Sequence, residues 1–501
     1  MSALDDKYWT IIGSGSIGAK AEELRKKTSA IVDAGFTPNP RIVLAMGFFE
    51  EFRKRNGIDR ALARGASSEE LTELVSDTPF QEPELRAIRH LVKLFRRDFP
   101  GVPLVIRSSA HGDCRGTGIY ESEFCPHFRN EQKTIGALMR AIKRVLESEF
   151  SESAIAFRKD LDLPGGMAVI IEPVFGQKIQ GRYQWGDKAI DIFGPSHSGY
   201  AYSSTASGSG NGFIVSGLPT QAVAGGGFRI NEGQEERFED ILYRSFFEMR
   251  NSDERIASYA GDKVIEWRHG EWLSPVSARM NHGVSARNAW IADRYFPDWL
   301  FCRLKKLEAL LGKPQYVEFA FRETGAAPEI AILQIADVNK KTDFFEFPQT
   351  GNSVIRSNFV VGTGSVTCHK AVCVFNPDDI YLLHDFNQKN KGYLVIYGGR
   401  LTSIMLKGHS TTLRYNDLSN ASALVEIAEC HHSRHPKAHF EGMIDETGKI
   451  LMVTREIDWE VLEPFQKLMK KKNGVELRIY DAEFRATASE RRQKGIVELI
   501  G

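Results

Sequence analysis

The apolar positions of the chain repeat with two different periods between residues 1 and 340. Apolar residues three and four positions apart predict amphipathic helices at 21–34, 69–78, 83–99, 237–251 and 297–312. Short apolar runs predict buried strands at 104–106, 166–175 and 188–194. Two further runs, 316–323 and 329–338, flank the turn TGAAP and predict a β-hairpin, while 41–49 fits either a strand or the start of a buried helix. This mixture predicts an α/β or α+β body built around mixed sheets.

Two stretches of unusual composition divide the chain. Residues 195–227 are rich in Gly and Ser, which predicts loops that either close over a ligand or form a poorly ordered surface. Residues 341–354 are polar and predict a linker. A chain of 501 residues is too long for one ordinary core, so we expect a domain at 1–340 and a smaller α/β domain at 355–501.

Charge and cysteine usage narrow the class of protein. The 65 basic and 65 acidic residues cancel, which argues against a general attraction to nucleic acid or to an anionic membrane. The six cysteines form no CxxC pair, as is typical of reduced thiols. The start MSALDDKYW is acidic, unlike a signal peptide, and no apolar run reaches the roughly 20 residues of a membrane span. We therefore expect a cytoplasmic protein.

The stretch LVIRSSAHGDCRGTGIY at 104–120 is the first candidate for chemistry. An apolar strand leads into Arg107, Ser108 and Ser109, followed by a glycine-rich turn. Backbone N–H groups in such a turn can approach an anion closely, and an arginine suits bidentate contact with phosphate. The other interpretation is a strand–loop junction in which Arg107 pairs with a nearby carboxylate.

Three further stretches fit a nucleotide site. GSGSIGAKAEEL presents Lys20 at the start of a helix after a glycine-rich turn, a place suited to phosphate. Glu172 ends the strand of AVIIEPVF, where main-chain groups could contact an adenine edge. Glu318 and Gln334 lie on the two strands of the predicted hairpin, and their oxygens together suit Mg²⁺. Taken singly, each is equally consistent with a surface lysine, a glutamate at the edge of the core or the polar face of a hairpin.

The order and spacing of these stretches resemble the N-terminal nucleotide-binding domain of the pyruvate phosphate dikinase and phosphoenolpyruvate synthase family, an ATP-grasp fold. The GGKGxxL-like turn of the family resembles GAKAEEL, its VRSSA signature resembles IRSSA, and its VVVQxMV-like hinge resembles VIIEPVF. Its GVAFTxxP…GxGExVVSGxxxP segment resembles residues 198–220, and its IEWA…LQxRP ending resembles residues 317–337. The resemblance covers about two thirds of the chain.

The resemblance implies a role for each candidate residue. Lys20 and Arg107 would bind ATP phosphates, Glu172 would lie at the adenine hinge, and the pair Glu318 and Gln334 would bind Mg²⁺. The family has an arginine shortly after the glutamine, but Ala336 and Asp337 occupy that place here. This departure predicts that one phosphate contact is lost or is supplied from elsewhere.

Histidines are concentrated in the second domain, where seven of the 13 lie between residues 369 and 439. His435 and His439 are four residues apart, as zinc ligands on one helix would be, although Pro436 argues against an uninterrupted helix. In the dikinase family a small swivelling domain carries a phosphohistidine in a GGxxSHxA-like motif. CHHSRHPKA resembles that motif without its glycines, which implies that His435 is the phosphoryl carrier, with His409 and His439 as rivals. A polar surface loop is the remaining interpretation.

The resemblance implies an ATP-dependent phosphotransferase of the dikinase type, with AMP, phosphate and a phosphorylated small molecule as products. Family members that make phosphoenolpyruvate add a large C-terminal barrel, whereas fewer than fifty residues follow about residue 460. We therefore expect an acceptor other than pyruvate, unless a partner chain supplies the barrel. Two alternatives stay open: an ATP-grasp ligase that releases ADP, and a non-catalytic nucleotide-binding regulator.

Overall fold

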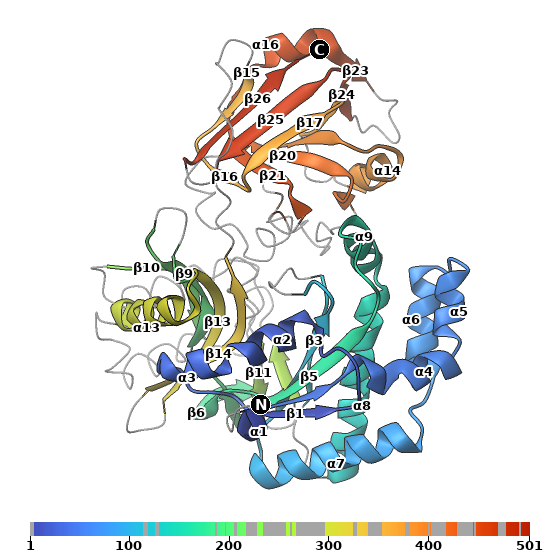
Figure 1. The fold of residues 1–501 in the computed structure, drawn as a ribbon, viewed down its shortest axis with the longest axis vertical. Coiled ribbons are helices and arrows are strands. Elements are labelled where there is room, and N and C mark those ends of the chain that lie inside the picture. Colours follow the sequence, from blue (N-terminus) through green and yellow to red (C-terminus); the bar gives the residue numbers. More distant parts are fainter. Residues whose placement is uncertain are drawn as a thin grey trace. The chain divides into compact units, whose positions relative to one another are not determined.

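The computed structural model describes most of the chain (Figure 1). The described residues are 5–113, 119–125, 130–185, 188–195, 197–204, 208–216, 228–233, 257–260, 263–266, 296–323, 328–338, 353–375, 381–398, 401, 417–427, 444, 447–468, 477–489 and 492–500. Backbone contacts divide the chain into two compact units, Met1–Ala154 with Leu163–Val338 and Ile155–Asp162 with Asn339–Gly501. The division into domains at 1–340 and 355–501 stays a prediction, and unit 2 takes in the short segment Ile155–Asp162 as well.

The first sheet of unit 1 has the strand order β1-β2-β5-β3-β4. The first two strands are parallel, and the other neighbouring pairs are antiparallel. The bounds are Trp9–Ile12 (β1), Arg41–Leu44 (β2), Met167–Pro173 (β5), Leu104–Ala110 (β3) and Ser122–Cys125 (β4). All positions of β2 and β5 are buried, which explains why their sequences are almost continuously apolar.

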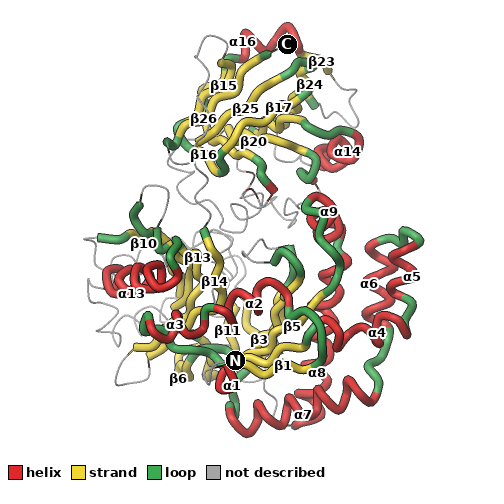
Figure 2. The backbone as a smooth tube through the Cα atoms, in the orientation of Figure 1, coloured by secondary structure: helices red, strands yellow, loops and turns green. Residues whose placement is uncertain are grey.

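The helices before residue 161 precede or lie between the strands of this sheet along the chain, and those at 18–26 and 131–147 pack on it (Figure 2). Their bounds are Asp5–Tyr8 (α1), Gly18–Lys26 (α2), Thr28–Asp33 (α3), Glu50–Arg55 (α4), Ile58–Ala63 (α5), Ser68–Asp77 (α6), Glu82–Asp98 (α7), Glu131–Glu147 (α8) and Glu152–Asp160 (α9), with 3-10 turns at Met46–Phe49 and Ser148–Phe150. Local signals define the ends: Gln81 and Glu84 form a capping box at α7, and the side chains of Ser67 and Asn130 cap α6 and α8.

Two more sheets complete unit 1. One has the order β10-β9-β8-β13-β14, and the other has the order β12-β11-β7-β6. The bounds are Gln177–Trp185 (β6), Lys188–Gly194 (β7), His197–Tyr202 (β8), Asn211–Ser216 (β9), Phe228–Asn231 (β10), Ala257–Ala260 (β11), Lys263–Glu266 (β12), Gln315–Glu323 (β13) and Pro328–Asp337 (β14). Helix α13, Phe296–Leu311, packs on β13 and α3, so that one apolar core joins this sheet to α2, α3 and the first sheet.

Several sequence predictions need correction. Strand β3 does not end at Ile106 but continues to Ala110, because small buried Ser108 and Ser109 fit between β5 and α2. The predicted helix 21–34 is two helices that meet at Lys27, and 41–49 is a strand followed by a 3-10 turn. The prediction of loops throughout 195–227 is wrong at β8 and β9, which are paired strands whose glycines allow close backbone approach. The predicted helix 237–251 lies outside the described residues.

Unit 2 contains two sheets of its own, with the orders β17-β25-β26-β15-β22 and β16-β21-β20-β19-β18-β24-β23. The bounds are Ser353–Ser357 (β15), Val360–Val361 (β16), Gly364–Cys368 (β17), Ala371–Val374 (β18), Tyr393–Tyr397 (β19), Ala421–Ile427 (β20), Ile450–Thr454 (β21), Glu456–Ile457 (β22), Gln466–Leu468 (β23), Arg478–Tyr480 (β24), Phe484–Ser489 (β25) and Lys494–Leu499 (β26), with helices at Tyr381–Lys389 (α14) and Trp459–Leu462 (α16) and a 3-10 turn at Glu463–Phe465. Strands β18 to β21 pair in parallel, as expected of a small α/β unit. Among the helices described in either unit, none is long and apolar enough to cross a membrane.

Candidate functional site

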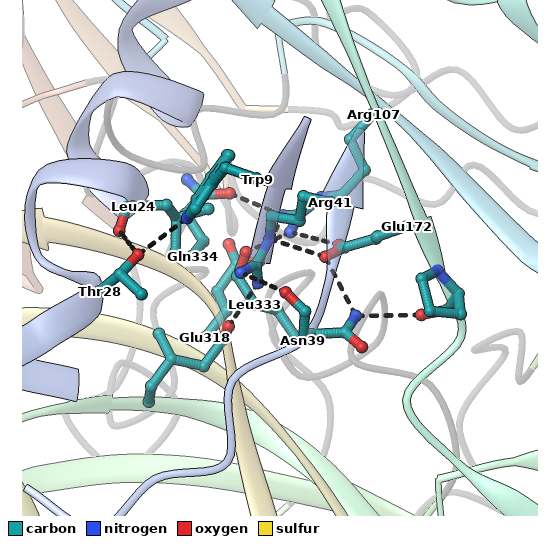
Figure 3. Close-up of polar contacts among 12 residues, drawn as sticks. Trp9, Leu24, Thr28, Asn39, Arg41, Arg107, Glu172, Glu318, Leu333 and Gln334 are labelled. Atoms are coloured by element: carbon teal, nitrogen blue, oxygen red, sulfur yellow. Dashed lines mark hydrogen bonds and ion pairs between the residues drawn. The ribbon is translucent and has the colours of Figure 1, made fainter. Parts of the chain in front are cut away.

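Arg107 connects the first sheet to the β13–β14 hairpin (Figure 3). Its Nη2 donates to Gln334 Oε1 at 2.8 Å and to Glu318 Oε2 at 3.2 Å. Its Nη1 donates to Glu172 Oε1 at 3.4 Å and to the carbonyl oxygen of Leu333. The residue is only 8% exposed, so both nitrogens depend on protein acceptors. The four strands β3, β5, β13 and β14 therefore meet at one guanidinium.

The hairpin brings Glu318 and Gln334 together through its strand register. The two residues are direct partners in the β13–β14 ladder, and an irregularity follows, because Phe319 pairs with Ile332. Leu333 is thereby left without a partner in the ladder, and its carbonyl oxygen accepts from Arg107. The hydroxyl of Tyr316 donates to Glu318 Oε1 at 3.1 Å and fixes the other carboxylate oxygen.

Glu172 is shared by two arginines. It lies near the end of β5 and is 2% exposed. Its Oε2 pairs with Arg41 Nε at 2.9 Å and accepts from Asn39 Nδ2 at 3.2 Å, while its Oε1 accepts from Arg107. Both carboxylate oxygens of Glu172 therefore bind groups within the protein. The predicted contact between main-chain groups near Glu172 and adenine stays a prediction.

Lys20 of α2 lies beside Ser108 of β3. Its Nζ pairs with Asp113 Oδ2 at 3.0 Å and lies 3.4 Å from Ser108 Oγ, and the residue is 5% exposed. Helix α2 is held against β3 by a hydrogen bond from the backbone N–H of Ala21 to Ser109 Oγ. Gly18 permits this approach, because an added Cβ would lie 1.8 Å from the carbonyl oxygen of Ser109.

Burial and charge act in opposite directions on the two arginines. Burial acts to lower the pKa of Arg107, but the carboxylates of Glu172 and Glu318 outweigh it, and the pKa is raised. Burial also acts to lower the pKa of Arg41, and repulsion from Arg107 adds to this effect. The attraction of Glu172 acts in the opposite direction but is outweighed, so the pKa of Arg41 is lowered. Burial and the neighbouring Glu318 raise the pKa of Tyr316, so its hydroxyl remains a donor. The site is therefore a buried set of opposite charges.

The structure brings most of the predicted residues together. Arg107 contacts Glu172, Glu318 and Gln334 directly, as the carboxylate-pairing interpretation of Arg107 requires, and Lys20 contacts its neighbour Ser108. The histidine candidates His409, His435 and His439 lie outside the described residues. The sequence did not reveal Asn39, Arg41 or Asp113. Arg41 has one sequence signal, since a charged residue opens a strand that is otherwise continuously apolar.

Two of these side chains carry oxygens of the kind that ligate a divalent cation. Glu318 Oε2 and Gln334 Oε1 both lie within hydrogen-bond distance of the single atom Arg107 Nη2, so two hard oxygens converge on one point that already holds positive charge. Carboxylate and amide oxygens are suitable Mg²⁺ ligands, and Mg²⁺ at this point would neutralise charge on the nucleotide phosphates.

A cavity of about 450 Å³ lies elsewhere in unit 1. It is bordered by Gly15 and Ser16 of the glycine-rich turn, by residues of the helical region α4 to α6 and by the start of β5. None of Lys20, Arg107, Glu172, Glu318 and Gln334 lines it. The cavity is therefore not the point at which the predicted site residues converge.

The fold and the matched segment define an ATP-grasp type of nucleotide-binding domain. Residues 15–344 match the family described as the AMP/ATP-binding domain of pyruvate phosphate dikinase. Because the match covers more than half of the 501 residues, the chain belongs to this family. No curated protein sequence matches the chain.

Proposed function

We propose that the chain is an ATP-dependent phosphotransferase of the dikinase type. The observation that carries the proposal is the convergence of Arg107 with Glu318 and Gln334 inside a domain of the AMP/ATP-binding family. An arginine between a carboxylate and an amide is also found in purely structural networks, but the family match favours phosphate and metal as the ligands.

The proposed roles follow from the positions of the side chains. Glu318 and Gln334 hold Mg²⁺ through their oxygens, and Arg107 binds phosphate oxygens with its guanidinium. Lys20, which Asp113 holds at the end of β3, provides a second positive charge for the phosphates. Because Lys20 and Arg107 are held in the site by protein contacts, their positive charge is close at hand before the phosphoryl group transfers.

The second part of the proposal concerns the carrier of the phosphoryl group. His435 accepts the β-phosphoryl group of ATP on an imidazole nitrogen as AMP leaves, water takes the γ-phosphoryl group and releases it as phosphate, and the phosphorylated histidine passes its phosphoryl group to a small-molecule acceptor. The support is the resemblance of CHHSRHPKA to the family motif. A partner chain remains one source of the acceptor site.

The experiment is incubation with ATP labelled at the β or the γ phosphate. The proposal predicts a protein-bound label from the β phosphate that is stable to base and labile to acid, and that disappears in His435→Ala. His409→Ala and His439→Ala are the matched controls and should keep the label. Release of ADP without bound label would instead identify an ATP-grasp ligase.

One observation favours a second candidate, a nucleotide-binding regulator without catalysis. The position of the family's arginine after Gln334 is Ala336, which is 2% exposed and carries no charge. Tight binding of ATP with neither label transfer nor ADP release would support the regulator and contradict the phosphotransferase.

A further inference from the structure

Arg41 lies within the candidate site and has no part in the proposed function. Its Nε pairs with Glu172 Oε2 at 2.9 Å, its Nη2 donates to the carbonyl oxygen of Ile332 at 2.8 Å, and its Nη1 donates to that of Asn39 at 3.1 Å. The guanidinium also lies over the ring of Trp9, with its carbon 5.4 Å from the ring centre. Because Nη1 and Nη2 have backbone acceptors and Nε is ion-paired with Glu172, Arg41 is held in place independently of any ligand.

Arg107 is held in a different way. Two of its acceptors, Glu318 Oε2 and Gln334 Oε1, are the oxygens that the proposed function assigns to the cation. When these oxygens bind a cation, Arg107 Nη2 loses both acceptors and becomes available to a phosphate oxygen. Its Nη1 keeps the carbonyl oxygen of Leu333 as an acceptor, so the side chain stays anchored when it turns away from Glu172.

The behaviour of Arg107 then depends on the charge of Glu172. This carboxylate is 2% exposed and is paired with both arginines, so water contributes little to its neutralisation. With Arg41 present, Glu172 stays paired when Arg107 turns toward a phosphate. Without Arg41, the carboxylate would have Arg107 as its sole arginine partner, and it would both retain that guanidinium and repel the phosphate.

We propose that Arg41 is a positioning residue that neutralises Glu172 and so frees Arg107 to exchange Glu318 and Gln334 for nucleotide phosphate. This role rests on the proposed binding of Mg-ATP. It also gives a physical reason for the missing arginine after Gln334: the second guanidinium of the site comes from β2 and acts through Glu172 rather than on the phosphate itself.

The test is calorimetric titration of Mg-ATP into the full chain and two variants, Arg41→Gln and the double variant Arg41→Gln/Glu172→Gln. We expect Arg41→Gln to bind at least tenfold more weakly than the wild type. The double variant removes one positive and one negative charge, so we expect its affinity to return to within about threefold of the wild type. A direct contact between Arg41 and phosphate would not be rescued in this way.

Arg55→Gln is the matched control, since it breaks the pair with the buried carboxylate of Glu84 at 3.0 Å in unit 1 away from the site. It should bind Mg-ATP as the wild type does. The role is overturned if Arg41→Gln binds within threefold of the wild type, or if the double variant is as weak as Arg41→Gln. If Arg41→Gln does not fold, the double variant is decisive by itself, because it leaves no unpaired buried charge. An affinity of the double variant within threefold of the wild type supports the role, and a weaker affinity overturns it. A wild-type chain that binds no Mg-ATP overturns the proposed function and this role with it.

Discussion

At the residue scale, buried Arg107 holds together the two oxygens that the proposed function assigns to the cation. Its Nη2 lies between Glu318 and Gln334, 3.2 and 2.8 Å from their oxygens. Without this guanidinium, a buried carboxylate oxygen and an amide oxygen held so close together would cost free energy. The arginine therefore keeps Glu318 and Gln334 in the positions from which, in the proposed function, they bind the metal.

The first prediction concerns the charge of Glu318. Replacing Glu318 by Gln keeps the shape of the side chain but removes the charged ligand, so we expect the affinity for Mn²⁺, used as a substitute for Mg²⁺, to fall at least tenfold in the presence of ATP. Electron paramagnetic resonance of free Mn²⁺ measures this affinity. Glu329→Gln, on the same hairpin but paired with Arg322, is the control and should bind Mn²⁺ as the wild type does. Equal affinities in the two variants would contradict the metal role of Glu318.

A second prediction at this scale concerns pH and Asp337. Burial acts to raise its pKa, but hydrogen bonds from Lys27, Lys313 and Gln315 prevail and lower it to about 2. The folded pKa lies below the ordinary value, so the stabilisation is complete above about pH 4 and is lost as the pH falls through about 2. We expect Asp337→Asn to reduce the free energy of unfolding by about 1 kcal/mol or less at pH 7, because the carboxylate is partly exposed.

Urea unfolding at several pH values checks this expectation. The difference between wild type and Asp337→Asn should shrink below pH 4 and vanish near pH 2. Asp33→Asn, on the exposed face of α3, is the control and should have little effect at any pH. A difference that persists near pH 2 would show that packing rather than charge is responsible.

At the element scale, the position of Lys20 depends on the close contact of α2 with β3. Gly18 has a φ of +76°, and a Cβ there would lie 1.8 Å from the carbonyl oxygen of Ser109. Gly18→Ala must therefore move the start of α2, and Lys20 with it. We expect a loss of about 2–4 kcal/mol in the free energy of unfolding and weaker binding of ATP.

Gly57→Ala separates the two causes of this loss, which are backbone strain at a positive φ and the clash of the added Cβ with Ser109. Gly57 also has a positive φ, +66°, but nothing lies within 4 Å of an added Cβ. Urea unfolding should show about 1 kcal/mol for Gly57→Ala, from backbone strain alone. If Gly18→Ala costs no more than Gly57→Ala, the contact of α2 with β3 does not position Lys20.

The elements differ in how far the sequence predicts them. Helices α6, α7 and α13 and the β13–β14 hairpin agree closely with their predicted ranges, because each buries one regular set of apolar residues. Strands β8 and β9 were missed because their small residues give no periodic pattern. Their stability comes from backbone pairing with β13 and with each other, which the sequence does not display.

The candidate site was predictable in part for the same reason. Lys20, Arg107, Glu318 and Gln334 stand in recognisable local motifs. Arg41 stands in none, and its importance comes from the register of β2 and β5, which places it beside Glu172. Such a residue becomes visible only when the strands are paired.

At the scale of the whole molecule, each of the two units has a large apolar core among the described residues. One is centred on β13, α2 and α13, and the other on the strands of unit 2. Each core can unfold as a cooperative unit, so we expect two transitions in calorimetry. Mg-ATP at 100 times its dissociation constant should stabilise the first unit by about 2.7 kcal/mol and leave the second transition unchanged. Glu318→Gln identifies the transition of unit 1, because in this variant Mg-ATP should no longer raise the midpoint temperature of that transition. A nucleotide that raises only the midpoint temperature of the unit 2 transition would place its site outside unit 1.

The most direct test of the account is a crystal structure with Mn²⁺ and a non-hydrolysable ATP analogue. The account predicts an anomalous peak at coordination distance, about 2.0–2.3 Å, from oxygens of Glu318 and Gln334, with Arg107 turned toward a phosphate oxygen. An analogue and Mn²⁺ bound elsewhere, with Arg107 still bonded to Glu318 and Gln334, would contradict it.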